Sequence, residues 1–380
     1  MPRRIIQLIP ALLCFLFVSL QAAPLPVPKP PAIGAKAYIL QDYNSQQVIA
    51  EKDSGKSIEP ASITKLMTAY VVFTELKNGN IHLNDKVTIS EKAWRTPGSR
   101  MFVEVNTKVS VEDLLKGMII QSGNDATVAL AEYVAGSEDT FAALMNRHAE
   151  KLGLTNSHFM NATGLPDPEH YMSARDIARL AGNLIREFPE HYQWYSQKKF
   201  TYNDITQYNR NKLLWRDESV DGMKTGHTDS AGYCLVTSAK QGDMRLISVV
   251  LGTNSVNARA ETSQALLNYG FRFFETHKLY DADKQLATSR VWKGSTDTIS
   301  LGVDKPLYAT IPRGQYKSLD ASMTIDNRIT APITAGKNLG MVHVKLGDTV
   351  IAEQPLVALQ GINEGSFWQR IRDEALLYFE

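Results

Sequence analysis

Ser62 and Lys65 are the residues whose types and spacing most directly suggest chemistry in this sequence. A serine hydroxyl becomes a useful nucleophile only when a nearby base removes its proton. A lysine amine can be that base when burial or a second cation lowers its pKa. Residues three apart lie on one face of a helix, and a helix N-terminus offers free N–H groups to a developing oxyanion. Alone, the pair is better explained by a capping serine and a surface lysine, a pattern that Ser196 and Lys199 repeat.

Two further short motifs place polar side chains in apolar settings. The apolar stripe of residues 114–119 stops at Ser122-Gly123-Asn124, which predicts a helical region interrupted at Ser122. A plain turn between two helices is the alternative. Lys224-Thr225-Gly226 leads into a strand and is followed by His227. In this order and these contexts, the three motifs together are a far more specific signal than any one of them.

The segments around these motifs predict a large domain that mixes strands and helices. Two short strands, 37–40 and 47–50, form a hairpin before the Ser62 helix, and the strands 233–239 and 245–251 form a second hairpin. Helices are expected at 126–135, at 138–152 and from Ser173, which is the expected N-cap. Arg259 is expected to open the last helix of the domain, which covers residues 260–274.

The composition changes after residue 274. Short strands are predicted at 298–303, 307–311, 323–325, 341–346, 349–353 and 356–359, with no helical run between them, so a small all-β sandwich is expected. Residues 363–380 return to a helical pattern, with the apolar stripe Phe367, Trp368, Ile371, Ala375, Tyr378 and Phe379. The length and the charges of this tail favour an amphipathic helix in the plane of a membrane over a membrane-spanning helix.

The amino-terminal residues predict export. Arg3 and Arg4 precede an apolar run from Ile5 to Leu20, so residues 1–23 are interpreted as a signal peptide, with an uncleaved membrane anchor as the alternative. Residues 24–34 form a proline-rich linker. Cleavage would leave Cys234 as the only cysteine, which is expected to be a small buried hydrophobic residue. An exported protein without an intrachain disulfide must be stabilised by packing.

Five runs of residues resemble one known family. They are 60–68 (PASITKLMT), 121–126 (QSGNDA), 209–211 (NRN), 222–228 (GMKTGHT) and 270–274 (GFRFF). The chain resembles the low-molecular-mass penicillin-binding proteins, more narrowly the D-alanyl-D-alanine carboxypeptidases of the penicillin-binding protein five and six type. The resemblance implies an α/β fold: a serine β-lactamase/transpeptidase-like domain at 35–274, with an antiparallel sheet, helices on both of its faces and a helical subdomain. A small all-β sandwich at 275–362 and the amphipathic tail follow.

The resemblance also implies roles for individual residues. Ser62 is the expected nucleophile, Lys65 its base and Ser122 a proton relay. Substrate binding is expected from Asn124, Lys224, Thr225, Gly226, His227 and Arg259. Lys224 would lie near Lys65, and its charge would lower the pKa of Lys65. Asp176 and Arg210 would contact each other near His227, unless both are surface ion-pair residues.

The implied function is removal of the terminal D-alanine from peptidoglycan pentapeptide stems through an acyl-enzyme, with β-lactam antibiotics as covalent inhibitors. The protein would be periplasmic and attached peripherally to the inner membrane surface by its tail. No cofactor is implied. The eight histidines are scattered without a His-Glu-x-x-His run, which argues against a zinc peptidase, and the net charge of +1 suggests no nucleic-acid partner.

Three alternatives compete with this function. A class A β-lactamase would normally carry Ser-Asp-Asn in place of Ser122-Gly123-Asn124, and would lack the β domain and the tail. Peptidoglycan endopeptidases of the same superfamily generally lack the β domain. A protein that only binds peptide stems would not need a nucleophile and a base.

Overall fold

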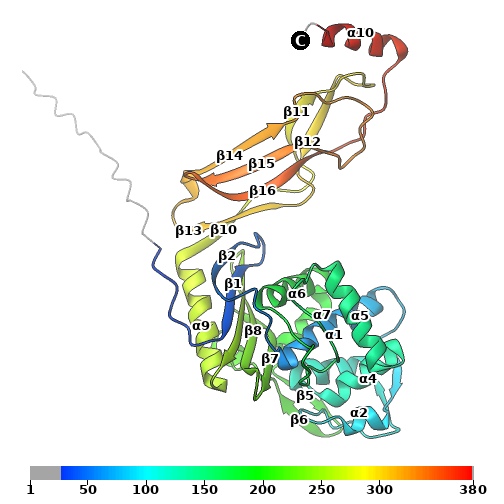
Figure 1. Ribbon diagram of the computed structural model, residues 1–380, viewed down its shortest axis with the longest axis vertical. Helices are drawn as coiled ribbons and strands as arrows, with labels where there is room; N and C mark the ends of the chain where they lie inside the picture. The colour runs from blue at the N-terminus through cyan, green and yellow to red at the C-terminus, as the bar shows by residue number, and fades with distance from the viewer. Residues whose placement is uncertain (1–26, 379–380) are drawn as a thin grey trace, which may run out of the picture.

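The structure is a computed structural model that describes residues 27–378. The chain forms two lobes in sequence order: a larger lobe of strands and helices, and a smaller lobe of strands that ends in a short helix (Figure 1). The predicted signal peptide lies outside the described residues. Residues 27–34 of the predicted linker form neither helix nor strand, and the hydroxyl of Tyr269 donates a hydrogen bond to the carbonyl of Pro28 (2.9 Å).

A five-stranded antiparallel sheet forms the centre of the larger lobe. Its order is β2 (Val48–Lys52), β1 (Ala37–Asp42), β9 (Met244–Thr253), β8 (Gly232–Gln241) and β7 (Val220–Thr228). Both predicted hairpins, β1–β2 and β8–β9, are confirmed. Successive side chains of a strand point to opposite faces, and nearly all of those on β9 are buried, so helices must cover both faces of the sheet.

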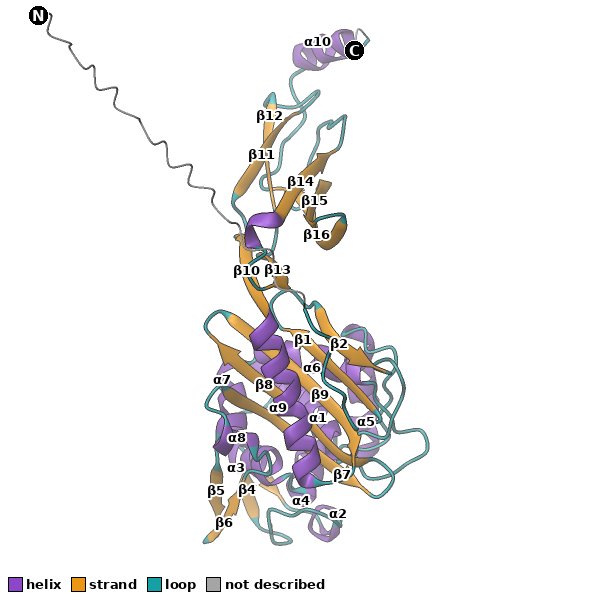
Figure 2. Ribbon diagram, turned by 90° about the vertical axis from the view of Figure 1, so that its left-hand side faces the viewer, coloured by secondary structure: helices purple, strands orange, loops and turns teal. Residues whose placement is uncertain are grey.

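One helix, α9 (Val256–Phe273), covers one face of the sheet (Figure 2). It packs on β8 and β9 over a core that includes Leu246, Val250, Leu266 and Leu267. The prediction that Arg259 opens this helix is wrong. Ser255 is the N-cap, because its hydroxyl accepts a hydrogen bond from the N–H of Ala258, and Arg259 lies buried one turn inside.

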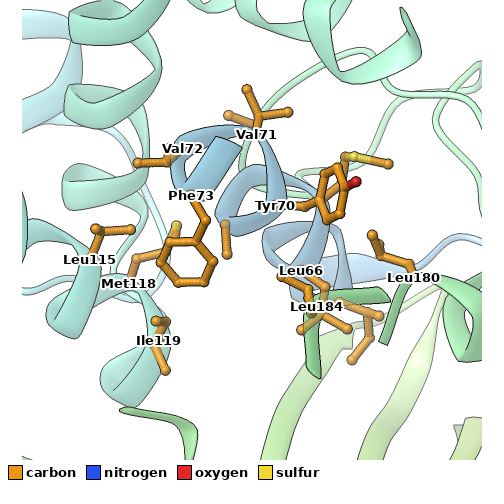
Figure 3. Close-up of a cluster of buried hydrophobic side chains, with 14 of the residues drawn as sticks. Leu66, Tyr70, Val71, Val72, Phe73, Leu115, Met118, Ile119, Leu180 and Leu184 are labelled. Atoms are coloured by element: carbon orange, nitrogen blue, oxygen red, sulfur yellow. The ribbon is translucent and has the colours of Figure 1, made fainter. Parts of the chain in front are cut away.

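The other face of the sheet carries a helical region built around α1 (Lys65–Lys77). Figure 3 shows Leu66, Tyr70 and Phe73 of this helix pointing toward side chains of the neighbouring helices. The first nine residues of α1 are all buried, so the helix is enclosed rather than amphipathic. The surrounding elements are α2 (Glu91–Arg95), α3 (Val111–Lys116), α4 (Asn124–Ala135), α5 (Glu138–Lys151), α6 (Ala174–Glu187), α7 (Pro189–Tyr192), β3 (Lys86–Thr88), β4 (Lys108–Ser110), β5 (Lys199–Tyr202) and β6 (Ile205–Tyr208). The short helix α8 (Leu213–Arg216) instead contributes Leu213 and Leu214 to the core under α9.

The predicted interruption at Ser122 is confirmed. Helix α3 continues into a π-helical turn, η2 (Gly117–Gln121), and Ser122 then adopts a left-handed conformation with φ of +68° before α4 begins. Such turns are frequent at functional sites because they change the direction of a side chain within a helical region. The interruption places Ser122 and Asn124 inside the lobe, where both are buried.

The smaller lobe is all β, as predicted. A two-stranded sheet pairs β10 (Phe274–Tyr280) with β13 (Leu307–Pro312). A five-stranded sheet has the order β11 (Gln285–Arg290), β12 (Thr298–Gly302), β16 (Thr349–Ala358), β15 (Asn338–Leu346) and β14 (Leu319–Ile325). The predicted strands 349–353 and 356–359 are one strand, and β10 and β11 were not predicted.

The predicted tail helix is α10 (Phe367–Leu377), and the last two residues of the chain lie outside the described part. Ser366 and Gln369 form a capping box at its start. Its apolar side chains Phe367, Trp368 and Ile371 are exposed. Between residues 27 and 378, no helix is both long enough and apolar enough to cross a membrane.

Candidate active site

Ser62 lies in a turn of 3-10 helix, η1 (Ala61–Thr64), that leads directly into α1. Ala61 has a φ of +48°, a conformation that residues with a side chain rarely adopt. Lys65 is the first residue of α1, and its side chain is only 1% exposed. The expected closeness of the pair is confirmed, because Lys65 Nζ lies 3.0 Å from Ser62 Oγ.

The two other partners of Lys65 Nζ determine what this amine can do. They are Asn124 Oδ1 at 2.7 Å and the carbonyl oxygen of Thr163 at 2.6 Å. Amide and carbonyl oxygens only accept hydrogen bonds, so they take both N–H groups of a neutral amine. The lone pair of neutral Lys65 then faces Ser62, whose hydroxyl can donate its proton to it.

The surroundings favour this neutral form. Burial, and next the positive charge of Arg210, lower the pKa of Lys65 from 10.5 to about 7, against the opposing effect of Asp125 and Glu138. The pKa of Lys224 is also well below its usual range, first because of burial and then because of the charge of Lys65. The expectation that the charge of Lys224 lowers the pKa of Lys65 is therefore corrected: desolvation is the main cause, and Arg210 is the main cationic contributor.

Ser122 and Lys224 form a second pair beside the first. Lys224 lies in β7, where it is buried, and its Nζ donates hydrogen bonds to Ser122 Oγ (2.8 Å) and to the carbonyl of Thr225 (2.9 Å). The left-handed backbone at Ser122 brings this hydroxyl to Lys224. Because the Ser122 oxygen accepts from Lys224, its own O–H stays available to a further acceptor.

The amide of Asn124 is held in one orientation. Its Nδ2 donates to the carbonyl of Pro97 at 2.6 Å, and its backbone N–H donates to the carbonyl of Ser99 at 2.7 Å. Only the amide oxygen is then left to face Lys65. A loop far away in the sequence thus determines which atom of Asn124 meets the proposed base.

Gly226 lets β7 pass close to the turn that carries Ser62. A Cβ atom at this position would lie 2.8 Å from the carbonyl oxygen of Pro60, closer than real Cβ contacts. The hydroxyl of Thr228 donates to the carboxylate of Glu59 at 2.6 Å and ties the end of β7 to the segment before Ser62. The exposed ring of His227 lies 4.0 Å from that of Tyr233, between centroids.

A cavity of about 490 Å³ opens above these groups, within the range of small-molecule sites. Its lining includes eight of the predicted residues: Ser62, Ser122, Asn124, Arg210, Thr225, Gly226, His227 and Arg259. Lys65 and Lys224 are buried next to it, in contact with Ser62 and Ser122. The three motifs, which span residues 62 to 226 of the sequence, therefore meet around one cavity.

Two guanidinium groups give the cavity a cationic side. Arg259 donates through Nη1 to the carbonyls of Gly226 (3.1 Å) and Cys234 (3.4 Å), which anchors it beside β7. Arg210 makes no hydrogen bond or ion pair with any residue between 27 and 378. Arg259 is buried and Arg210 is exposed to solvent, and desolvation lowers the pKa of both groups, but guanidinium stays charged at neutral pH. Such a cavity favours an anionic ligand.

Comparisons with known proteins agree with this geometry. The family described as D-alanyl-D-alanine carboxypeptidase matches residues 26–255, and the family described as the C-terminal domain of penicillin-binding protein 5 matches residues 274–364. This chain belongs to the D-alanyl-D-alanine carboxypeptidase family. The D-alanyl-D-alanine carboxypeptidase DacC of Escherichia coli is 46% identical over 373 residues, which cover 96% of this chain and 93% of DacC.

Solved structures of this carboxypeptidase family support the two-lobed architecture. Penicillin-binding protein 5 of Haemophilus influenzae matches with a TM-score of 0.85 and 44% identity, over 88% of this chain and 99% of that one. Penicillin-binding protein 6B of Escherichia coli matches with a TM-score of 0.73 and 37% identity, over 87% and 97%. Both lobes are therefore shared with these proteins.

The predicted contact between Asp176 and Arg210 is wrong for the part of the chain that the structure describes. Asp176 lies in the first turn of α6, where it is buried and does not line the cavity. Its carboxylate accepts hydrogen bonds from the N–H of Asn156 (2.8 Å) and the hydroxyl of Ser157 (2.8 Å). These two donors satisfy the buried carboxylate, so it does not need Arg210 as a partner. Asp176 therefore supports the loop at residues 156–157 and does not contact Arg210.

Thr163 was not predicted, although its carbonyl is one of the two acceptors that orient Lys65. The side chain of Asn161 accepts from the N–H groups of Thr163, Gly164 and Leu165 and forms the turn that presents this carbonyl. A backbone oxygen carries no residue-type signal, so motif reading cannot find it. The Asn-x-x-Gly pattern indicates a turn, but it does not indicate that the turn contacts Lys65.

His170 was also missed. Its Nδ1 accepts from the N–H of Met160 (3.1 Å), so its proton sits on Nε2, which donates to Thr64 Oγ1 (2.8 Å). The Thr64 hydroxyl then donates to the carbonyl of Ala61 (2.9 Å), which supports the turn that carries Ser62. Burial lowers the pKa of His170 to about 4, which keeps it neutral.

Proposed function

We propose that this protein is a serine D-alanyl-D-alanine carboxypeptidase that removes the terminal D-alanine from peptidoglycan pentapeptide stems. The observation that carries the proposal is the geometry of Lys65: two obligate acceptors take its N–H groups, and its lone pair is left for Ser62. A family of carboxypeptidases with the same two-lobed architecture supports the substrate class.

Acylation begins when neutral Lys65 takes the proton of Ser62. Oγ of Ser62 then attacks the carbonyl carbon between the two D-alanines, and the carbonyl oxygen becomes an oxyanion. The backbone N–H groups of Ser62 and His227 are the proposed donors to this oxyanion. Gly226 supports this arrangement, since it allows β7 to run beside the 3-10 turn.

The proton must next reach the nitrogen of the departing D-alanine. Ser122 is the proposed relay: it gives its O–H proton to that nitrogen and regains one from protonated Lys224, which is hydrogen-bonded to it. The C–N bond then breaks, D-alanine leaves, and the acyl-enzyme remains on Ser62. Lys65 then releases its proton to solvent and Lys224 regains one, and water hydrolyses the ester with neutral Lys65 as the proposed base.

Substrate binding follows from the same surfaces. The peptide would lie along the edge of β7, where Gly226 leaves room, with its amide held by Asn124. Thr225 and Arg259 are the proposed ligands of the terminal carboxylate, and Arg210 supplies a second cation to the cavity. A β-lactam, which also carries a carboxylate, would enter this site and acylate Ser62.

Mass spectrometry of a pentapeptide stem after incubation with the full chain tests the proposal. We expect loss of one D-alanine with the natural protein and none with Ser62→Ala, while Ser196→Ala stays active. Cleavage of cross-linked dimers instead would indicate an endopeptidase, and rapid turnover of penicillin a β-lactamase. Absence of any covalent penicillin adduct on the natural protein would reject the enzymatic function.

We also propose the domain limits and the location. Residues 1–23 would be a signal peptide, 24–34 a linker, 35–274 the catalytic domain, 275–362 the β domain and 363–380 the tail, in keeping with the residues that the two families match. Export would place the enzyme in the periplasm, where its substrate lies. The apolar side chains on α10 would then attach it peripherally to the inner membrane surface.

The position of α10 supports this attachment. Figure 1 shows it at the end of the smaller lobe that is remote from the larger lobe, so attachment would hold the active site away from the lipid. Arg370 and Arg372 are outnumbered by Asp373, Glu374 and Glu380, so attraction to anionic lipid should be weak. Vesicle co-sedimentation with and without residues 365–380 tests the anchor, and equal binding of the two forms would reject it.

A further inference from the structure

Asp125 directly follows Asn124 at the start of α4, and its side chain is fully buried. Its carboxylate accepts hydrogen bonds from the backbone N–H groups of Met101 (2.8 Å), Phe102 (2.8 Å) and Val103 (3.2 Å). It also accepts from the N–H of Ala126 in its own helix (2.9 Å). Three of these four donors belong to a segment more than 20 residues earlier in the sequence.

The hydrogen bonds to Asp125 stabilise an unfavourable backbone conformation in this segment. Phe102 has a φ of +69°, an unfavourable conformation for a bulky side chain, and its ring is exposed, so packing does not enforce it. The Asp125 carboxylate binds three consecutive backbone N–H groups and so fixes the backbone of this segment. Arg100 Nε lies 3.8 Å from the same carboxylate and is the nearest cation that the structure describes.

The anchored segment continues from the loop that orients Asn124. The carbonyls of Pro97 and Ser99 accept from the side-chain Nδ2 and the backbone N–H of Asn124. That pairing turns Asn124 Oδ1 toward Lys65. A displaced loop would leave the amide free to rotate, and an amide nitrogen facing Lys65 would compete for its lone pair.

We propose that Asp125 is a positioning residue for the acylation step, which rests on the proposed function. Its carboxylate holds the backbone of residues 101–103 in place, and with it the preceding loop of residues 97–99. The carbonyls of that loop fix the orientation of the Asn124 amide, and this amide orients Lys65. Asp125 touches neither substrate nor Ser62. Its effect on the reaction passes through Asn124.

The charge of Asp125 supplies a second, separable consequence. The charge of Arg210 lowers the pKa of Lys65, and the charges of Asp125 and Glu138 raise it. The buried amine of Lys224 is also close enough for the charge of Lys65 to lower its pKa. Removing the anion therefore shifts the midpoint of the acid limb of the rate profile to lower pH. Because this shift follows from the charge alone, the rate at the high-pH plateau, where Lys65 is fully neutral, is the readout of positioning.

The test is Asp125→Asn in the full chain, followed by fluorescent penicillin labelling in two readouts. The first is the number of labelled sites per molecule, and the second is the acylation rate constant per labelled site from pH 5 to 9. We expect near-complete labelling at a rate roughly 10- to 100-fold lower, as for a catalytic group displaced by about an ångström. We also expect the midpoint at lower pH.

The matched control is Asp42→Asn. Asp42 is an equally buried carboxylate that accepts from a backbone N–H, that of Ser45, at the junction with the smaller lobe. Its loss should cost stability and leave both readouts unchanged. Should Asp125→Asn not fold, Asp125→Glu keeps the charge but misplaces the carboxylate, so its rate should fall at an unchanged midpoint.

Two results overturn the proposal: fewer labelled sites with an unchanged rate per site, or full labelling with an unchanged plateau rate per site, wherever the midpoint lies. Neither bears on the proposed function itself. That function fails only if the natural protein forms no penicillin adduct or releases no D-alanine.

Discussion

The rate at which penicillin acylates Ser62 should follow the ionisation of Lys65, with a midpoint near pH 7. At pH 7 roughly half of the Lys65 amines are neutral, whereas roughly 3 in 10,000 would be neutral at the ordinary lysine value. The low pKa thus raises the fraction of neutral Lys65 at pH 7 roughly a thousandfold. At pH 5 roughly one amine in a hundred is neutral, so the rate should be about fiftyfold lower than at pH 7.

The sharpest perturbation of this profile is Arg210→Ala. The charge of Arg210 is, after burial, the main cause of the low pKa of Lys65, and it has no anionic partner among the described residues. Removing it should raise the pKa of Lys65 and move the midpoint to higher pH, the direction opposite to Asp125→Asn. Arg216→Ala, an exposed arginine outside the cavity, is the control and should leave the midpoint in place.

Stopped-flow measurement with a fluorescent penicillin well below saturation gives the second-order rate constant at each pH. Ionic strength is held constant, and circular dichroism at each pH verifies that the protein stays folded. A rate that rises tenfold per pH unit through pH 9 without a plateau would mean an ordinary lysine. A rate that is flat from pH 5 to 8 would remove Lys65 as the base.

Two further predictions concern binding and stability. Arg259→Ala should lower kcat/KM for a peptide with a free terminal carboxylate by roughly ten- to a hundredfold, and much less for its carboxamide, because a charged hydrogen bond is lost; a parallel loss for both peptides would reject Arg259 as the carboxylate ligand. The pKa of His170 in the folded protein is about 4, below the ordinary 6.5. Its contribution to the free energy of unfolding is therefore complete above pH 6.5 and is lost as the pH falls through 4. This contribution amounts to about 3 kcal/mol. Denaturant unfolding should therefore show a smaller fall in stability at acid pH for His170→Gln than for the natural protein.

The side chains of the candidate active site could be predicted from the sequence because their types and spacing are specific. Ser62, Lys65, Ser122 and Lys224 meet at one site, as expected. The same Ser-x-x-Lys spacing at Ser196 carries no such meaning, since both of its residues are exposed there and Ser196 donates to a nearby carbonyl. The Ser62 motif differs from the Ser196 motif because it lies at the buried start of α1.

Groups that act through backbone atoms could not be predicted. The carbonyl of Thr163 and the N–H groups that bind Asp125 have no residue-type signature, and the loops that present them are irregular. Asp176 was misplaced because a charged residue in a helix's first turn can be satisfied locally, and no sequence pattern shows whether it is. Strands β10 and β11 were missed because their largely polar, mostly half-buried side chains give only weak alternation.

The pairing of Ser122 with Lys224 gives the proposed reaction its direction. Lys224 donates to the oxygen of Ser122, so the one hydroxyl proton of Ser122 must point elsewhere, toward the cavity and the departing nitrogen. Both lysines are buried, and burial with mutual repulsion keeps their pKa values low, so a proton gained by Lys65 from Ser62 makes a second proton on Lys224 less favourable. Acylation would therefore itself drive a proton through Ser122 to the leaving amine, with no increase in the charge buried at the site.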